Sequence, residues 1–212
     1  MGPDGVAVIR GRKPPIRALA SIDIKVIAPE VDHDFLQLAF TVDCAQNSRR
    51  LQLGSEVLGQ IGKGFYHIMW ELQGERLIGA AGCVAGAQRL FDRTLEYATE
   101  RSAFGRPIGK FQAIRHKFAD MATKIEAGRQ MVYTTAWRFQ NGEYPVREIS
   151  MAKLYTARMA CEVADECLQI HGGAGYMKEY GIERAWRDLR LNRIGAGTDE
   201  IMLDVIGRSY GI

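Results

Sequence analysis

Few side chains of this sequence stand at spacings that define a chemical site by themselves. Glu71 and Glu75 are four residues apart, so on a helix either carboxylate could accept a proton from the same region of space. A helix glutamate is usually solvated, and position alone does not distinguish a base from a surface residue. The run HGGAG (residues 171–175) could let backbone N–H groups approach a phosphate, but it is also typical of a helix C-cap and turn.

The cysteines do not indicate metal or redox chemistry. Cys44, Cys83, Cys161 and Cys167 show no C-x-x-C spacing, and no pair of histidines stands at metal-ligand distance. We interpret them as small buried side chains of a reducing compartment, and expect no bound metal.

The composition is that of an ordinary globular protein. Apolar residues make up 47% and charged residues 25% of the 212 residues. The net charge of +3 is small and no basic run is interleaved with aromatic residues, which argues against nucleic-acid binding. The start, MGPDGVAVIRGRKPP, lacks the apolar core of a signal peptide, and no stretch is apolar enough to span a membrane. We expect a cytoplasmic protein, or one of an organelle matrix if a targeting segment is missing.

Apolar residues recur at helical spacing after Gly64 and predict three long helices. The stripe of the first helix consists of Leu77, Ala81, Val84, Gln88, Phe91 and Leu95. The second stripe consists of Ile114, Phe118, Met121, Ile125, Gly128, Val132 and Thr135. The third consists of Leu154, Ala157, Cys161, Ala164 and Leu168. Breaks are expected at residues 102–107, 141–142 and 171–173, and two short helices near 182–192 and 198–208, the last N-capped by Thr198.

This pattern predicts a mainly α protein, an antiparallel four-helix bundle over residues 61–212. Small residues on the stripes and beside them imply that the helices approach closely: Ala81, Ala85, Gly128, Ala157 and Ala164. Residues 1–60 differ, because the stretches 21–28 and 35–42 cluster β-branched and apolar residues as short strands do. We expect a short N-terminal β-containing segment there, either a remnant of a middle β domain or unrelated strands.

Four local motifs resemble the C-terminal helical domain of acyl-CoA dehydrogenases. RSAFGRPIGKFQ (residues 101–112) resembles the family's R-x-x-F-G-x-x-I-x-x-F-Q motif, and QIHGGAGY (169–176) its Q-x-x-G-G-x-G-Y turn. RDLRLNRIGAGTDEIM (187–202) is similar to the closing segment, and GKGF (62–65) to the entry into the first long helix. The motifs occur in the family's order, whereas the family's N-terminal helical domain and most of its middle β domain are not matched.

The resemblance implies FAD-dependent α,β-dehydrogenation of an acyl-CoA thioester, in which a glutamate removes the α proton. Most members carry that glutamate in the closing segment, where this sequence has Ala196. Isovaleryl-CoA and long-chain members place it on the first bundle helix within L-x-x-E-R-L, which resembles ELQGERLI at residues 71–78. Glu75 is therefore the expected base, and Glu71 is the nearest alternative.

The resemblance also implies binding residues. The expected acyl-CoA contacts are Tyr66, Arg76, Ala196 and Gly197. Arg76 suits a CoA phosphate or ribose, though a surface ion pair is an equal alternative, and Tyr66 could be a plain core aromatic. The expected FAD contacts are Arg101, Gln112, Gln169, Ile170, His171, Gly172, Gly173, Thr198, Asp199 and Glu200, with no acid–base role for His171.

The implied assembly is a homodimer or homotetramer, because the family packs these bundles together and holds FAD partly on a neighbouring subunit. An electron-transferring flavoprotein is the expected electron acceptor. The leading interpretation is an acyl-CoA dehydrogenase of fatty acid metabolism, acting on a branched, medium or long acyl chain. A catalytically silent helical oligomerisation module derived from the family, and an acyl-CoA oxidase, remain the alternatives.

Overall fold

The structure is a computed structural model that describes residues 62–212. It is mainly α, as predicted, and the predicted N-terminal strands lie outside the described residues. Three long helices come first: α2 (Gly64–Glu100), α3 (Gln112–Gln140) and α4 (Val146–His171). Two short helices follow, α5 (Ile182–Leu191) and α6 (Asp199–Arg208), so the fourth element of the predicted bundle is this pair.

Short elements connect the helices. Between α2 and α3, strand β1 (Ser102–Ala103) pairs antiparallel with β2 (Arg106–Pro107), and the 3₁₀ turn η2 (Ile108–Lys110) follows. Two further 3₁₀ turns, η3 (Gly172–Tyr176) and η4 (Lys178–Tyr180), lead from α4 to α5. The sequence predicted the breaks at these places but not the paired strands, since two residues a side are too few to produce a period-two pattern.

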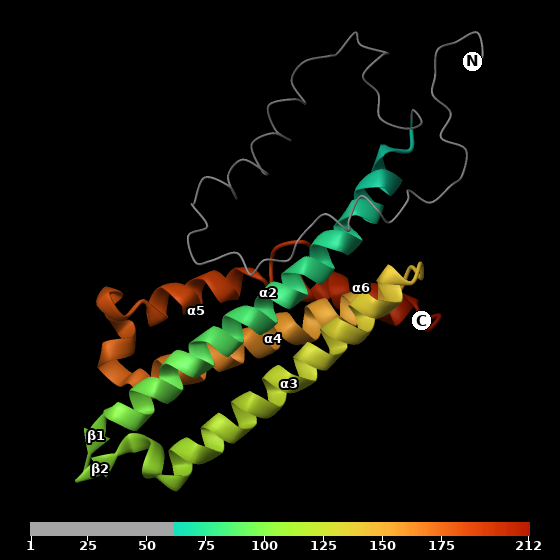
Figure 1. Cartoon of the computed structure of the whole chain (residues 1–212). Coiled ribbons are helices and arrows are strands. Elements are labelled where there is room, and N and C mark those ends of the chain that lie inside the picture. The colour runs from blue at the N-terminus through green and yellow to red at the C-terminus, as the bar shows by residue number, and fades with distance from the viewer. Residues whose placement is uncertain (1–61) are drawn as a thin grey trace, which may run out of the picture. The chain divides into compact units, whose positions relative to one another are not determined.

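Helix α4 is the central element of the bundle. It packs against α3, α5 and α6, and the three long helices run antiparallel in succession (Figure 1). Helix α2 meets α3 through the rings of Phe91 and Phe118, whose centroids are 5.3 Å apart in an edge-to-face arrangement. It meets α5 at Gly86, where an added Cβ would lie 2.9 Å from the Leu189 side chain. The close approach predicted at Gly128 is also present, since a Cβ there would lie 3.2 Å from the Met159 side chain of α4, and Gly86 is a second such place that the sequence did not indicate.

The apolar stripe predicted for the first helix is wrong in register. The residues buried on α2 are Gln73, Arg76, Ala80, Cys83, Val84, Ala87, Leu90, Thr94 and Ala98, whereas Ala81, Ala85 and Leu95 are exposed. Narrow helix packing selects small side chains, so the buried face of α2 is lined with alanine, cysteine and threonine. The larger residues Leu77 and Phe91 pack at its flank. Counting large apolar residues therefore pointed to the neighbouring face.

The other two stripes agree better with the structure. On α3 the predicted residues from Phe118 to Thr135 are buried, Gly128 among them. On α4, Ala157 and Ala164 are buried, while Cys161 is half-buried. Burial raises the pKa of the Cys83 thiol to about 12 and that of Cys167 to about 11, so both stay protonated at neutral pH. Cys44 lies outside the described residues.

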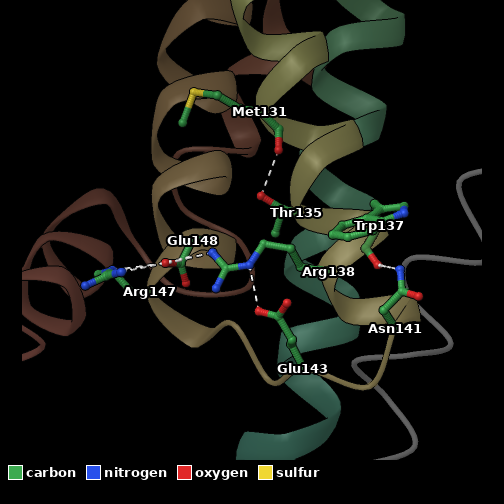
Figure 2. A network of polar contacts seen from close by, with 8 residues as sticks. All are labelled: Met131, Thr135, Trp137, Arg138, Asn141, Glu143, Arg147 and Glu148. Atoms are coloured by element: carbon green, nitrogen blue, oxygen red, sulfur yellow. Dashed lines mark hydrogen bonds and ion pairs between the residues drawn. The ribbon is translucent and has the colours of Figure 1, made fainter.

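An ion-pair network fixes the reversal between α3 and α4. Arg138, in the last turn of α3, donates from Nε to Glu143 (2.7 Å) and pairs through Nη1 with Glu148 of α4 (3.0 Å) (Figure 2). Arg147 shares the same Glu148 oxygen at 2.7 Å. The amide of Asn141 donates to the Trp137 carbonyl at the helix end (2.8 Å), so a side chain satisfies one of the last carbonyls of α3.

None of the helices within 62–212 combines the length and the hydropathy that crossing a lipid bilayer requires. Across the same residues, His, Cys, Asp and Glu side chains form no group of three or more able to hold a metal ion.

Candidate functional site

A buried arginine ties the first long helix to the closing turn. Arg76 is 5% exposed, and its Nε donates to the carbonyl oxygen of Ala196 at 2.9 Å, 120 residues further along the chain. Burial lowers the pKa of Arg76, and the charge of Glu75 is among the influences that oppose this. Arg76 and Ala196, which were predicted to line the same site, are thus in direct contact. The Nε of Arg76, however, already binds the protein main chain.

A second buried cation holds the next carbonyl of the same turn. The ammonium of Lys153 on α4 donates to the Gly197 oxygen, and burial lowers the pKa of this lysine. Ala196 and Gly197 both have positive φ, +54° and +105°. The φ of Gly197 favours glycine there, and a Cβ at this position would also displace the terminal methyl of Met202, 2.9 Å away. We call residues 196–198 with Arg76 and Lys153 the closing corner.

The start of α6 completes this corner. The Thr198 hydroxyl accepts a bond from the Ile201 N–H (3.4 Å), which confirms the predicted N-cap. Asp199 is only 3% exposed, and its Oδ2 accepts from Nε of Arg193 at 2.8 Å and of Arg158 at 3.0 Å. Glu200 is exposed. Of the three residues predicted to contact a cofactor here, the carboxylate of Asp199 is thus occupied by two arginines of its own chain.

The two candidate bases lie beside the corner on the exposed side of α2. Glu75 and Glu71 are both exposed within the described residues. Successive helix positions diverge by about 100°, so Glu75 flanks the buried Arg76 contact without entering it. Glu71 is one turn, about 6 Å, further from Arg76 along the axis. Tyr66, in the first turn of α2, is 66% exposed and is not the core aromatic that the sequence left open.

The remaining predicted residues gather at the opposite end of α2. Arg101 directly follows α2 and its N–H bonds the Tyr97 carbonyl (2.8 Å), while Gln112 is the first residue of α3. Gln169 is exposed in the last turn of α4, and Ile170 and His171 beside it are buried. These residues therefore form a second group, apart from the closing corner.

The glycine turn after α4 presents bare main chain. Gly172 has φ +60° and ψ −139°, a conformation suited to glycine, and both Gly172 and Gly173 are exposed. No atom lies within 4 Å of a Cβ built on either residue, so the space beside this backbone is open. With the exposed cation of Arg101 and the amide of Gln169 at the same end, the donor set fits a phosphate-bearing group.

Gly175 in the same turn should be intolerant of a side chain. A Cβ there would lie 2.8 Å from both the His171 Cβ and the Leu168 carbonyl oxygen. We expect Gly175→Ala to lower the free energy of unfolding by about 2 kcal/mol, since neither atom is the free end of a flexible chain. Urea unfolding measures this, with Gly173→Ala as the matched control in open space. Equal stability of the two variants would contradict this packing.

Sequence reasoning missed several residues that shape these two regions. Lys153 lies inside an apolar helical stretch. This position could have indicated a buried lysine with a fixed partner. Arg158 and Tyr97 carry no such signal, because their partners lie 41 and 74 residues away. Arg193 is only six residues before Asp199, but no periodicity relates the two.

The described residues are similar to a known family. A family model described as acyl-CoA dehydrogenase, C-terminal domain, matches residues 62–211. The probable acyl-CoA dehydrogenase YngJ of Bacillus subtilis is 46% identical over 154 residues, covering 73% of this chain and 40% of that protein. A subunit of the caffeyl-CoA reductase–Etf complex of Acetobacterium woodii, CarC, is 42% identical over 149 residues, covering 70% and 39%.

A solved structure gives the same result. The crystal structure of an acyl-CoA dehydrogenase from Geobacillus kaustophilus superposes with a TM-score of 0.72 at 42% identity, covering 73% of this chain and 41% of that one. The chain thus spans about 40% of the length of the relatives it matches.

Proposed function

Because the chain belongs to the acyl-CoA dehydrogenase family, we propose that it takes part in FAD-dependent α,β-dehydrogenation of an acyl-CoA thioester. The observation that carries this proposal is the 2.9 Å bond from Arg76 to the Ala196 carbonyl. This bond keeps the turn of α2 that contains Glu75 next to the closing segment, where most of the family has its catalytic glutamate. A carboxylate on α2 can therefore serve where position 196 has only a methyl group.

In the proposed reaction Glu75 accepts the proton from the carbon α to the thioester carbonyl. Arg76 and Lys153 hold the closing corner from the protein side by binding successive carbonyls. FAD, when bound, supplies the hydride acceptor for the β carbon. The residues proposed to hold FAD form two sets at opposite ends of α2: Thr198 and Glu200 at the closing corner, and Arg101, Gln112, Gln169 and the Gly172–Gly173 main chain at the other end. The bare glycine backbone and the exposed cation of Arg101 support the second set.

Glu75 needs a cover that residues 62–212 do not supply. A base for so weak an acid works best in a dry site that raises its pKa, and Glu75 is exposed in the described part of the chain. We propose that bound acyl-CoA or a second copy of the chain provides this cover. The same exposure favours the alternative, a catalytically silent oligomerisation module.

The absorbance spectrum of the purified full chain separates the two. We expect a yellow protein that binds FAD in titration and whose visible absorbance bleaches on anaerobic addition of acyl-CoA. A panel of branched, medium and long acyl-CoA thioesters identifies the substrate class. A colourless protein that takes up no FAD and still assembles stably would leave the silent module instead. Rapid reoxidation by oxygen would identify an oxidase.

We also propose a homodimer or homotetramer. Large apolar side chains are exposed on two of the long helices, among them Ile78 of α2 and Tyr133 and Trp137 of α3, each 63% exposed. Light scattering at micromolar concentration should report at least twice the chain's 23.7 kDa. A monomer at that concentration would contradict the proposal. An electron-transferring flavoprotein is the proposed electron acceptor, supported by the relative named for its Etf complex.

A further inference from the structure

The side chain of His171 is turned into the bundle, away from the glycine turn that follows it. The residue is 6% exposed, and its ring is stacked on Tyr97 of α2 with centroids 4.2 Å apart and planes 21° from parallel. Its Nδ1 lies 2.8 Å from the Cys167 carbonyl oxygen, which can only accept, so Nδ1 carries the proton and donates. The imidazole is therefore held on one face by α2 and at one edge by α4.

A third element closes on the same ring. Tyr180 of η4 presents its ring edge to both His171 (6.5 Å) and Tyr97 (6.4 Å). Arg93 of α2 donates from Nη2 to the Tyr180 carbonyl at 2.6 Å and fixes η4 in place. On the other side, the Cβ of His171 fills the space that a side chain at Gly175 would need. The ring thus joins α2, α4, η3 and η4 at one point.

From this junction we propose that His171 is a positioning residue, whose neutral ring stacked on Tyr97 sets the direction in which Gly172 and Gly173 present their main chain. Its consequence for FAD rests on the proposed function, in which this turn contacts the cofactor's phosphates. The side chain itself does not reach toward the open space, so His171 contributes to binding through its neighbours. The family resemblance implied a main-chain contact of this turn with FAD, His171 included, and the proposal adds a role for the His171 side chain.

The junction also predicts a pH response of the turn. Burial lowers the pKa of His171; the bond to the Cys167 carbonyl opposes this, and the charge of Arg93 adds to the lowering. The titratable or charged groups around the ring are Arg93 and Tyr97 from α2, Cys167 from α4 and Tyr180 from η4. Since the unfolded pKa is about 6.5, the stabilisation is complete above that pH and is lost as the pH falls through the lower folded value.

The test uses the FAD-free full chain, so it does not depend on catalysis. In Tyr97→Leu we expect amide hydrogen exchange of residues 172–176 to speed up at least tenfold relative to α4. Tyr97→Phe keeps the stacked ring and removes only the 3.5 Å bond from the Tyr97 hydroxyl to the His171 carbonyl, so it should stay close to wild-type exchange if the stacked ring positions the turn. Tyr133→Leu on the exposed face of α3 is the matched control. Unchanged exchange at 172–176, or an equal increase along all of α4, would overturn the inference.

Two further readouts separate this inference from the proposed function. The amide resonances of Gly172 and Gly173 should titrate with a midpoint below pH 6.5 in the wild type, and this titration should vanish in His171→Phe. Titration that persists in His171→Phe would overturn the positioning role. If the wild type binds FAD, Tyr97→Leu should weaken binding at least tenfold and Tyr97→Phe should not. If the wild type binds no FAD, the proposed function fails while the exchange and resonance data still decide the role of His171.

Discussion

Replacing Glu75 with glutamine should reduce acyl-CoA turnover by at least about a hundredfold while leaving the flavin spectrum unchanged. Removal of a positioned general base typically costs 10² to 10⁴ in rate. Glutamine keeps the size and the hydrogen-bonding shape of the side chain but cannot accept the α proton. Because Glu75 is exposed and flanks the buried Arg76 contact, the substitution should not disturb folding.

The matched control is Glu71→Gln, one helical turn away on the same exposed face of α2. The measurement is the rate of flavin reduction by acyl-CoA in anaerobic stopped flow, at equal FAD occupancy. We expect Glu71→Gln to reduce the flavin at close to the wild-type rate. A normal rate in Glu75→Gln combined with a loss in Glu71→Gln would transfer the role of base to Glu71. Normal rates in both variants would remove α2 from the proton transfer.

Asp199→Asn should lower the free energy of unfolding by about 2–3 kcal/mol, the largest stability effect we expect from an isosteric change. The carboxylate is buried and binds Arg158 and Arg193 through one oxygen, so it ties α4 and the segment after α5 to the start of α6. Losing one member of a buried ion-pair group costs about 3–5 kcal/mol, and we expect the lower end because both arginines are partly exposed and can rehydrate. Urea unfolding at pH 7 measures it.

A nearby aspartate provides the control. Asp204 on α6 forms an exposed i,i+4 pair with Arg208 at 3.0 Å, and Asp204→Asn should cost about 0.5 kcal/mol or less. If the two asparagine variants are equally stable, the buried group around Asp199 does not contribute as described.

The same carboxylate predicts a dependence of stability on pH. Burial alone would raise the pKa of Asp199, but the bonds and charges of Arg158 and Arg193 outweigh it and hold the pKa below its ordinary value. A carboxylate whose pKa is lowered by folding stabilises the protein above its unfolded pKa, about 3.9, and loses that contribution as the pH falls through the folded value. Below about pH 4 the wild type should therefore lose stability more steeply than Asp199→Asn.

The sequence predicted the elements of the bundle well and its packing less well. The breaks near Gly105, Gly142 and Gly172 follow from glycine, because each of these residues has positive φ in the structure. The N-cap at Thr198 follows from a local side-chain rule. The buried face of α2 was not predictable from large apolar residues, because many of its residues are alanines. One buried position, facing Ala196, is an arginine, Arg76.

The candidate sites divide in the same way. The contact between Arg76 and Ala196 was foreseeable only from family motifs, which carry long-range information that periodicity lacks, and the acyl-CoA role of these residues and Gly197 stays a prediction. The structure added what no local pattern contains: Lys153 on the Gly197 carbonyl, two arginines on Asp199, and the Tyr97 ring on His171. Lys153, Arg158 and Tyr97 each lie more than forty positions from their partners, and only Arg193 is near its partner in the sequence, six residues before Asp199.

The length of α2 has a consequence for stoichiometry. From Arg76 at the closing corner to Tyr97 at the glycine turn the helix advances twenty-one residues, about 30 Å at the α-helical rise. That is farther than the ribityl arm of one flavin carries its pyrophosphate from the ring, so under the proposed function the two ends of one chain serve different cofactor molecules. Each complete site would then contain residues of two chains. Dilution that separates the chains should therefore abolish FAD binding and turnover together.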